Sequence, residues 1–347
     1  MTSNVAVQAI VAHGADDLRL ESVPVGDPLP GEVEVSLAVG GICGSDLHYF
    51  HRGGVGDFMI REPLVLGHEI AGTVTRLGPE VSWLTVGTRV VVNPSRPCGR
   101  CSACMEGRRN LCANGTFLGS AARMPHTQGG FRERMVVAAE QCIVLPERLA
   151  FEDAVFAEPL SVALHAVGRA GSLLMRNVLI TGAGPIGVLI ALVAHHAGAA
   201  SITVTDVVDA PLEVASAVGA TATVNVAGEH EAVDGVDVAF EASGAPAALQ
   251  TCVDWLKPGG RLVLVGLMPP GTVPAAANKL VSRELAVVGS FRFVGSEFDS
   301  AVGALADGLD VSPLLSARFA FNDPAAAFAV ASRRESAMKV QIVRDDL

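Results

Sequence analysis

The sequence predicts an α/β protein of two domains, because its pattern changes near residue 150. Before that point, short β-branched runs such as Val33–Val39 and Ile70–Leu77 are separated by Gly and Pro, which is typical of strands joined by turns. After it, apolar runs alternate with helical stretches, which indicates a parallel sheet covered by helices. A chain of 347 residues is long enough for two domains.

The individual elements follow from the same patterns. Two further strands of the first domain are expected at Thr88–Asn93 and Arg134–Val137. In the second domain, the predicted strands are Asn177–Thr181, Ser201–Thr205, Val236–Glu241, Arg261–Val265 and Leu285–Gly289, and the predicted helices are Pro185–Ala197, Pro211–Val218 and Pro246–Leu256. After Ser290 the alternation stops, so we expect the tail to return to the first domain.

Charge and hydropathy argue against several kinds of partner. A net charge of −11 and a pI near 5.3 disfavour nucleic acid and anionic membrane surfaces. The most apolar stretch, Val178–Ala197, is long enough to span a membrane, but its glycines and Pro185 favour a strand, a turn and a helix. The N-terminus lacks the features of a signal peptide. We therefore expect a cytoplasmic protein that acts on a small molecule, with no membrane or nucleic-acid partner.

Four of the seven cysteines are closely spaced, with two, two and seven residues between them. They are Cys98, Cys101, Cys104 and Cys112. Four thiolates on a short loop make a closed tetrahedral site that suits Zn²⁺ and orders the loop without doing chemistry. A redox pair or an iron–sulfur cluster remains an alternative, since spacing does not exclude either. The metal-bound lobe is expected to cover about residues 94–114.

A second metal site is predicted between Gly40 and Gly72. Cys43, His68 and Glu69 offer a thiolate, an imidazole and a carboxylate, which leaves a fourth position open, as in catalytic zinc sites. Taken singly, Cys43 or His68 would more often be an ordinary buried or hydrogen-bonded residue. Ser45 and His48 follow Cys43 closely and could relay a proton, although His48 could instead only pack.

A dinucleotide-binding motif follows the predicted strand Asn177–Thr181 and opens an apolar helix. The motif comprises Gly182, Gly184, Pro185, Ile186 and Gly187. Asp206 ends the next strand, where its carboxylate would accept hydrogen bonds from the adenosine ribose and repel a 2′-phosphate. Because Val207–Pro211 contains no Arg or Lys, the sequence favours NAD over NADP. The alternative is a structural glycine turn beside a surface Asp.

An open zinc site and a nicotinamide cofactor together indicate interconversion of an alcohol and a ketone. The chain also resembles the zinc-dependent medium-chain dehydrogenases over essentially its full length, and Gly67–Glu69 and Ala157–Leu160 resemble the polyol branch. The resemblance implies a GroES-like β domain over 1–150 and 291–347 and a doubly wound (Rossmann) NAD domain over 151–290. It places the active site in the cleft between the two domains.

The resemblance also implies roles for particular residues. A catalytic zinc would be bound by Cys43, His68 and either Glu69 or Glu158, while the four-cysteine loop would hold a structural zinc. Tyr49, Glu158 and Arg292 would line the substrate pocket. The residues implied beside the nicotinamide are Val265, Gly266, Leu267, Ser290, Phe291 and Arg292. The family further suggests a homo-oligomer, either a dimer or a tetramer.

Several stretches resemble members of the branch that oxidise sugar acids. They are Asn93–Ser95, Gly119–Ala121, Pro125-His126, Gly129–Phe131, Gly289–Phe293 and Glu297-Phe298. This implies interconversion of L-idonate and 5-keto-D-gluconate at C5. A sugar acid carries a carboxylate, so we expect Arg292 to bind it, assisted by Arg123 or His126; a solvated loop charge is the commoner role for an arginine such as Arg123. A neutral-polyol dehydrogenase and a non-catalytic regulator that binds zinc and NAD are the alternatives.

Overall fold

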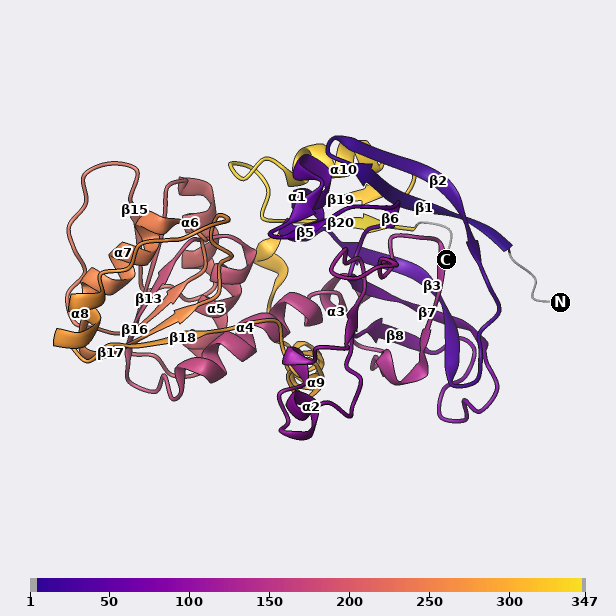
Figure 1. Ribbon diagram of the computed structural model, residues 1–347, viewed down its shortest axis with the longest axis horizontal. Coiled ribbons are helices and arrows are strands. Elements are labelled where there is room, and N and C mark those ends of the chain that lie inside the picture. Colours follow the sequence, from indigo (N-terminus) through magenta and orange to yellow (C-terminus); the bar gives the residue numbers. More distant parts are fainter. Residues whose placement is uncertain (1–4, 345–347) are drawn as a thin grey trace. The chain divides into compact units, whose positions relative to one another are not determined.

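The computed structural model describes residues 5–344, which divide into two compact units (Figure 1). The first unit comprises the chain up to Glu158, Val294–Arg333 and the residues from Lys339 on, and the second comprises Pro159–Phe293 and Arg334–Met338. The sequence placed the first boundary near residue 150 and the whole tail in the first domain. In the structure, the short segment Arg334–Met338 instead belongs to the second unit.

The first unit is built on a seven-stranded sheet in the order β12-β8-β7-β3-β20-β19, with β11 also paired to β3. Its strands are β3 (Glu32–Gly41), β7 (Glu69–Leu77), β8 (Arg89–Val92), β11 (Arg134–Ala138), β12 (Cys142–Val144), β19 (Leu315–Ala320) and β20 (Lys339–Val343). Apart from Glu32 at its start, β3 is buried throughout. The tail joins this sheet, because β20 pairs antiparallel with β3.

Smaller elements complete the first unit. Its short sheets contain β1 (Val5–Gly14), β2 (Asp17–Val25) and β6 (Leu64–Val65); β4 (Gly54–Val55) and β5 (Phe58–Met59); and β9 (Ser95–Arg96) and β10 (Thr116–Phe117). Its helices are α1 (Gly44–Arg52), α2 (Ser102–Met105), α3 (Phe151–Ala154), α9 (Gly295–Ala306) and α10 (Pro324–Ala331), with 3₁₀ turns η1 (Arg109–Leu111), η2 (Ala139–Gln141) and η3 (Ser312–Leu314). Helix α4 (Ala157–Ala170) begins in the first unit and continues into the second.

The second unit contains a six-stranded sheet in the order β15-β14-β13-β16-β17-β18, and every neighbouring pair is parallel. Its strands are β13 (Asn177–Thr181), β14 (Ser201–Asp206), β15 (Ala222–Asn225), β16 (Val236–Glu241), β17 (Leu256–Leu264) and β18 (Ala286–Gly289), and its helices are α5 (Pro185–His196), α6 (Asp209–Ala217), α7 (Pro246–Trp255) and α8 (Ala277–Ser282). Because β13 lies between β14 and β16, the strand order reverses there, and ligands of such sheets bind at that point.

Candidate active site

Strand pairing brings the predicted catalytic metal ligands together. Cys43 directly precedes α1 and follows the end of β3, while Glu69 opens β7 and pairs with Gly41 of β3. Cys43, His68 and Glu69 each offer one ligand atom, and these three atoms lie within 4.8 Å of one another. A thiolate, an imidazole and a carboxylate at this spacing suit a zinc ion with an open fourth position. Glu158 is not part of this group of three.

Asp46 joins the two loops that carry these ligands. Its Oδ2 accepts a hydrogen bond from the Cys43 N–H at 2.9 Å, and its Oδ1 accepts one from the Gly67 N–H at 3.1 Å. The same Oδ1 lies 3.8 Å from Nδ1 of His68. A carboxylate in that place orients a metal-binding histidine. We did not single out Asp46 from the sequence; its position three residues after a helix-capping residue was the available signal.

The site gathers negative charge in a buried environment. Burial disfavours a charge on His68, but the Asp46 carboxylate and the Cys43 sulfur outweigh it and raise the pKa of His68 well above its usual value. Burial, opposed by His68 and reinforced by Glu69, raises the pKa of Glu158 to about 7. Such a cluster is an environment in which a cation is stabilised.

Three of the side chains predicted to move protons or bind substrate, Ser45, His48 and Tyr49, lie on α1. Ser45 and His48 are both half-buried, and burial, with Arg52 and His51 nearby, lowers the pKa of His48. Tyr49 is 3% exposed, and its hydroxyl accepts a hydrogen bond from the Ala121 N–H at 2.9 Å. Tyr49 therefore contacts the loop in which this chain resembles the sugar-acid enzymes.

The structure gives Arg123 and His126 structural roles in that loop. Nδ1 of His126 donates to the Arg123 carbonyl at 2.7 Å, and Nε2 accepts from the Arg61 N–H at 2.9 Å, so both ring nitrogens are engaged. Arg123 donates through Nε to the Gly115 carbonyl at 2.7 Å and through Nη2 to that of Ala113. Backbone groups therefore hold both side chains in the loop, and assistance from Arg123 or His126 in binding a substrate carboxylate stays a prediction.

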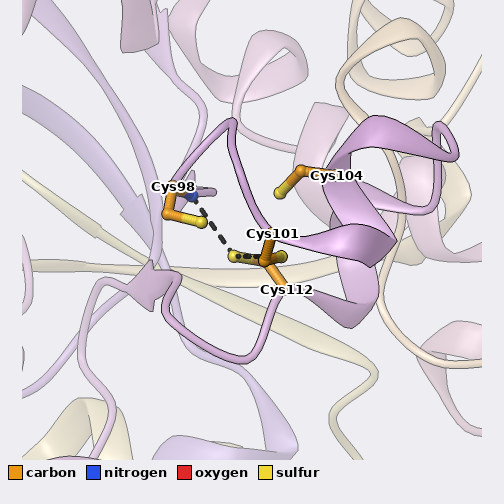
Figure 2. Close-up of side chains that lie close together, drawn as sticks. All are labelled: Cys98, Cys101, Cys104 and Cys112. Atoms are coloured by element: carbon orange, nitrogen blue, oxygen red, sulfur yellow. Dashed lines mark hydrogen bonds between the residues drawn. The ribbon is translucent and has the colours of Figure 1, made fainter.

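The four-cysteine loop offers a second candidate metal site. The side chains of Cys98, Cys101, Cys104 and Cys112 point toward one another, and their sulfurs lie within 4.8 Å of one another (Figure 2). The sulfurs of Cys101 and Cys112 are 3.7 Å apart, close to the ~3.8 Å that Zn–S bonds of about 2.3 Å give in a tetrahedron. All four are free thiols. This arrangement favours zinc over a disulfide pair.

In the second unit, the glycine motif shapes the turn between β13 and α5. Gly182 has a φ of +94°, which favours glycine, and a Cβ at Gly187 would lie 1.8 Å from the Gly182 carbonyl oxygen. Helix α5 begins at Pro185 directly after Gly184 and carries Ile186 in its first turn, so its N-terminus can face a pyrophosphate.

A cavity of about 310 Å³ adjoins this turn, a size within the usual range for ligand pockets. Gly182, Asp206, Val207 and Ser243 are among its lining residues. Arg334, from the tail, also lines it and forms an ion pair with Asp206 at 3.1 Å. Arg334 is distant along the chain from Val207–Pro211, so no local pattern beside Asp206 predicts this cation.

The other predicted cofactor contacts follow two neighbouring strands. Val265, Gly266 and Leu267 come after the end of β17, and Ser290, Phe291 and Arg292 come after the end of β18. The N–H groups of Val265 and Gly266 donate to the Glu241 carbonyl at 2.8 and 2.9 Å. The Arg292 guanidinium lies 4.9 Å from the centre of the Phe291 ring. Because β17 and β18 are parallel, both segments lie at the same edge of the sheet.

Comparison with known proteins agrees with this geometry. Residues 29–147 match the alcohol dehydrogenase GroES-like domain, and residues 185–307 match the zinc-binding dehydrogenase family. The chain belongs to the zinc-dependent medium-chain dehydrogenases. It is an enzyme of the alcohol and polyol dehydrogenase class that uses zinc and a nicotinamide cofactor, which confirms the predicted fold class, reaction class and cofactors.

Two relatives and one solved structure show which dehydrogenases the chain resembles. The chain is 41% identical to L-idonate 5-dehydrogenase (NAD(P)(+)) of Escherichia coli, over 89% of this chain and 91% of that protein. It is 35% identical to a sorbitol dehydrogenase of Bacillus subtilis, over 87% of each. A crystal structure of L-idonate 5-dehydrogenase from Escherichia coli matches 99% of both chains, with a TM-score of 0.93 and 38% identity. Among residues 5–344, no helix is long and apolar enough to cross a bilayer.

Proposed function

We propose that this enzyme interconverts L-idonate and 5-keto-D-gluconate with NAD. The observation that carries the proposal is the convergence of Cys43, His68 and Glu69 at the end of β3. The substrate assignment is supported by the similarity to L-idonate 5-dehydrogenase. A neutral polyol is the second candidate, because the similarity to a sorbitol dehydrogenase is only slightly lower.

In this proposal, zinc bound by Cys43, His68 and Glu69 would supply the Lewis acidity that lowers the pKa of the substrate hydroxyl. Asp46 holds the two ligand loops in register through its bonds to Cys43 and Gly67. Glu158, whose pKa is raised to about 7 chiefly by burial, is suited to hydrogen-bond the group in the open position. Ser45 and His48 take the hydroxyl proton toward solvent.

In the second unit, the N-terminus of α5 binds the pyrophosphate, and Asp206 accepts hydrogen bonds from the adenosine ribose. The segments that follow β17 and β18 would flank the nicotinamide, which when bound would supply the hydride acceptor for the substrate carbon.

Arg292 is proposed to bind the carboxylate that distinguishes a sugar acid from a polyol. The test is kcat/KM of Arg292→Ala on L-idonate and on sorbitol. We expect a loss on L-idonate at least ~10-fold larger than on sorbitol. Equal losses on the two substrates would show that Arg292 does not read the carboxylate.

The assignment of the whole reaction is tested by following NADH at 340 nm with L-idonate, sorbitol and xylitol, with zinc analysis of the same preparation. The proposal predicts the highest kcat/KM on L-idonate and two zinc ions per chain. A preference for a neutral polyol would favour the second candidate. A flat trace with every alcohol would contradict an enzymatic role.

We also propose a homo-oligomer joined through β18. This strand ends the six-stranded sheet, and it is largely exposed, with Val287 40% accessible. An unpaired strand edge readily pairs with another chain. Light scattering that gives the mass of a single chain would contradict this arrangement.

The four free thiols of the metal lobe support a reducing compartment such as the cytoplasm.

A further inference from the structure

The ion pair between Arg334 and Asp206 occupies the place where the adenosine ribose is expected. Nη2 of Arg334 donates to Oδ2 of Asp206 at 3.1 Å and lies 3.4 Å from Oδ1. The two side chains differ sharply in exposure, since Asp206 is 3% accessible and Arg334 is 61% accessible. Both line the cavity beside the glycine turn.

Backbone amides already hold the Asp206 carboxylate in place. Oδ2 accepts from the Ala183 N–H at 2.7 Å, and Oδ1 accepts from the N–H groups of Val207 and Val208 at 2.7 and 3.2 Å. A carboxylate has about four acceptor sites, so these amides and Arg334 nearly fill them. An incoming ribose hydroxyl must therefore share or displace the guanidinium.

The ion pair changes the charge that the 2′-phosphate of NADP would meet beside Asp206. An isolated Asp at the end of β14 would repel the 2′-phosphate of NADP. Here a guanidinium offsets that charge, and its exposed side chain can turn from the carboxylate to a phosphate. Arginine binds phosphate oxygens in two-point geometry, so one side chain can bridge Asp206 and a 2′-phosphate.

We propose that Arg334 is a cofactor-specificity residue that allows the enzyme to bind NADP as well as NAD. With NAD, the ribose diol takes the place of the guanidinium on Asp206. With NADP, the guanidinium stays between the carboxylate and the 2′-phosphate. The proposal rests on the nicotinamide-binding function and is independent of the identity of the alcohol.

Cofactor fragments test the proposal without any turnover. Binding of 2′,5′-ADP and 5′-AMP is measured by calorimetry for the wild type, Arg334→Gln and Arg334→Lys, and NADP⁺ and NAD⁺ are then compared in the same way. Arg333→Gln is the matched control, because Arg333 is the exposed neighbouring arginine and does not line the cavity. Thermal melting of each variant verifies that it is folded.

We expect Arg334→Gln to weaken 2′,5′-ADP at least ~10-fold, as removal of a charge-assisted contact should. It should change 5′-AMP affinity by less than about threefold, or improve it, since nothing then competes with the ribose. Arg334→Lys should fall between the wild type and Arg334→Gln, and Arg333→Gln should match the wild type. The proposal would be overturned if Arg334→Gln lost the same affinity for both fragments or lost none for 2′,5′-ADP. A wild type that does not bind 2′,5′-ADP would also overturn it. Because no alcohol is present, these outcomes do not depend on the L-idonate assignment.

Discussion

The ammonium of Lys339 lies 2.6 and 2.9 Å from the two carboxylate oxygens of Glu69. Both side chains are buried, at 2% and 0% exposure. Lys339 opens β20, and its Nζ also donates to the Ile42 carbonyl at 3.2 Å, next to Cys43. The tail of the chain therefore reaches the candidate catalytic site and fixes one of its carboxylates.

Substitution of Lys339 should be strongly destabilising. In the zinc-free protein, Lys339→Met leaves the Glu69 carboxylate buried without its cation, which typically costs roughly 3–5 kcal/mol. Urea denaturation measures the change in the free energy of unfolding. Lys279→Met is the matched control, because its pair with Asp254 is exposed and such pairs contribute about 1 kcal/mol or less. Similar losses in the two variants would contradict a special role for the buried pair.

The zinc content of two variants should show whether Glu69 or Glu158 binds the catalytic zinc. Glu69→Gln removes a member of the group whose ligand atoms lie within 4.8 Å, so the catalytic zinc should be lost. Glu158→Gln should keep two zinc ions per chain and lower kcat by about 10²–10⁴-fold, as loss of a proton-handling group does. Metal analysis and NADH formation measure the two effects. The assignment is reversed if Glu158→Gln loses the metal and Glu69→Gln retains it.

The cysteine lobe should depend on its metal. Cys104→Ser is expected to reduce zinc from two ions to one per chain and to lower the Tm, because structural zinc contributes folding free energy directly. Cys142→Ser is the control, since Cys142 is buried in β12 and lies outside the lobe. Two zinc ions retained in Cys104→Ser would argue against four-cysteine ligation.

Asp237 should make stability depend on acid pH. Burial would raise the pKa of Asp237, but hydrogen bonds from Lys257 and from the Asn177 N–H outweigh it and lower the pKa. A carboxyl whose pKa is lowered in the folded state stabilises the folded protein at pH values above its unfolded-state pKa, which is about 3.9. This contribution is lost as the pH falls through the folded-state pKa.

At pH 7, Asp237→Asn should therefore lower the free energy of unfolding by about 1–3 kcal/mol. The difference from the wild type should shrink toward pH 3. Chemical denaturation at several pH values measures it, with the exposed Asp234→Asn as the control. A difference that stayed constant with pH would exclude this origin.

The parallel sheet could be predicted from the sequence because its central strands are buried on both faces. The predicted bounds of β13 and β16 match the structure, where β13 is buried after its first residue and β16 is buried throughout. By contrast, β15 was not predicted, because its four residues are exposed or half-buried and carry little apolar signal. The start of β17 at Leu256 was also missed, since Pro258 and two glycines follow it.

Local motifs likewise indicate the candidate metal ligands but not the residues that contact them. Cys43 and His68 are recognisable from their spacing, whereas Lys339 and Arg334 reach their partners only because the tail folds back. Arg123 and His126 looked available for a substrate, but their partners are backbone groups that only the folded loop brings near. Residue pairs distant along the chain leave no pattern within one sequence.

A zinc ion held by Cys43 and His68 is the centre of the proposed chemistry. Anomalous diffraction at the zinc absorption edge, from crystals grown with NAD, tests this directly. We predict two zinc peaks, one among the four cysteines and one bonded at about 2.3 Å to the Cys43 sulfur and about 2.0–2.1 Å to a His68 nitrogen. A single peak in the cysteine lobe, with none between Cys43 and His68, would contradict the proposed chemistry.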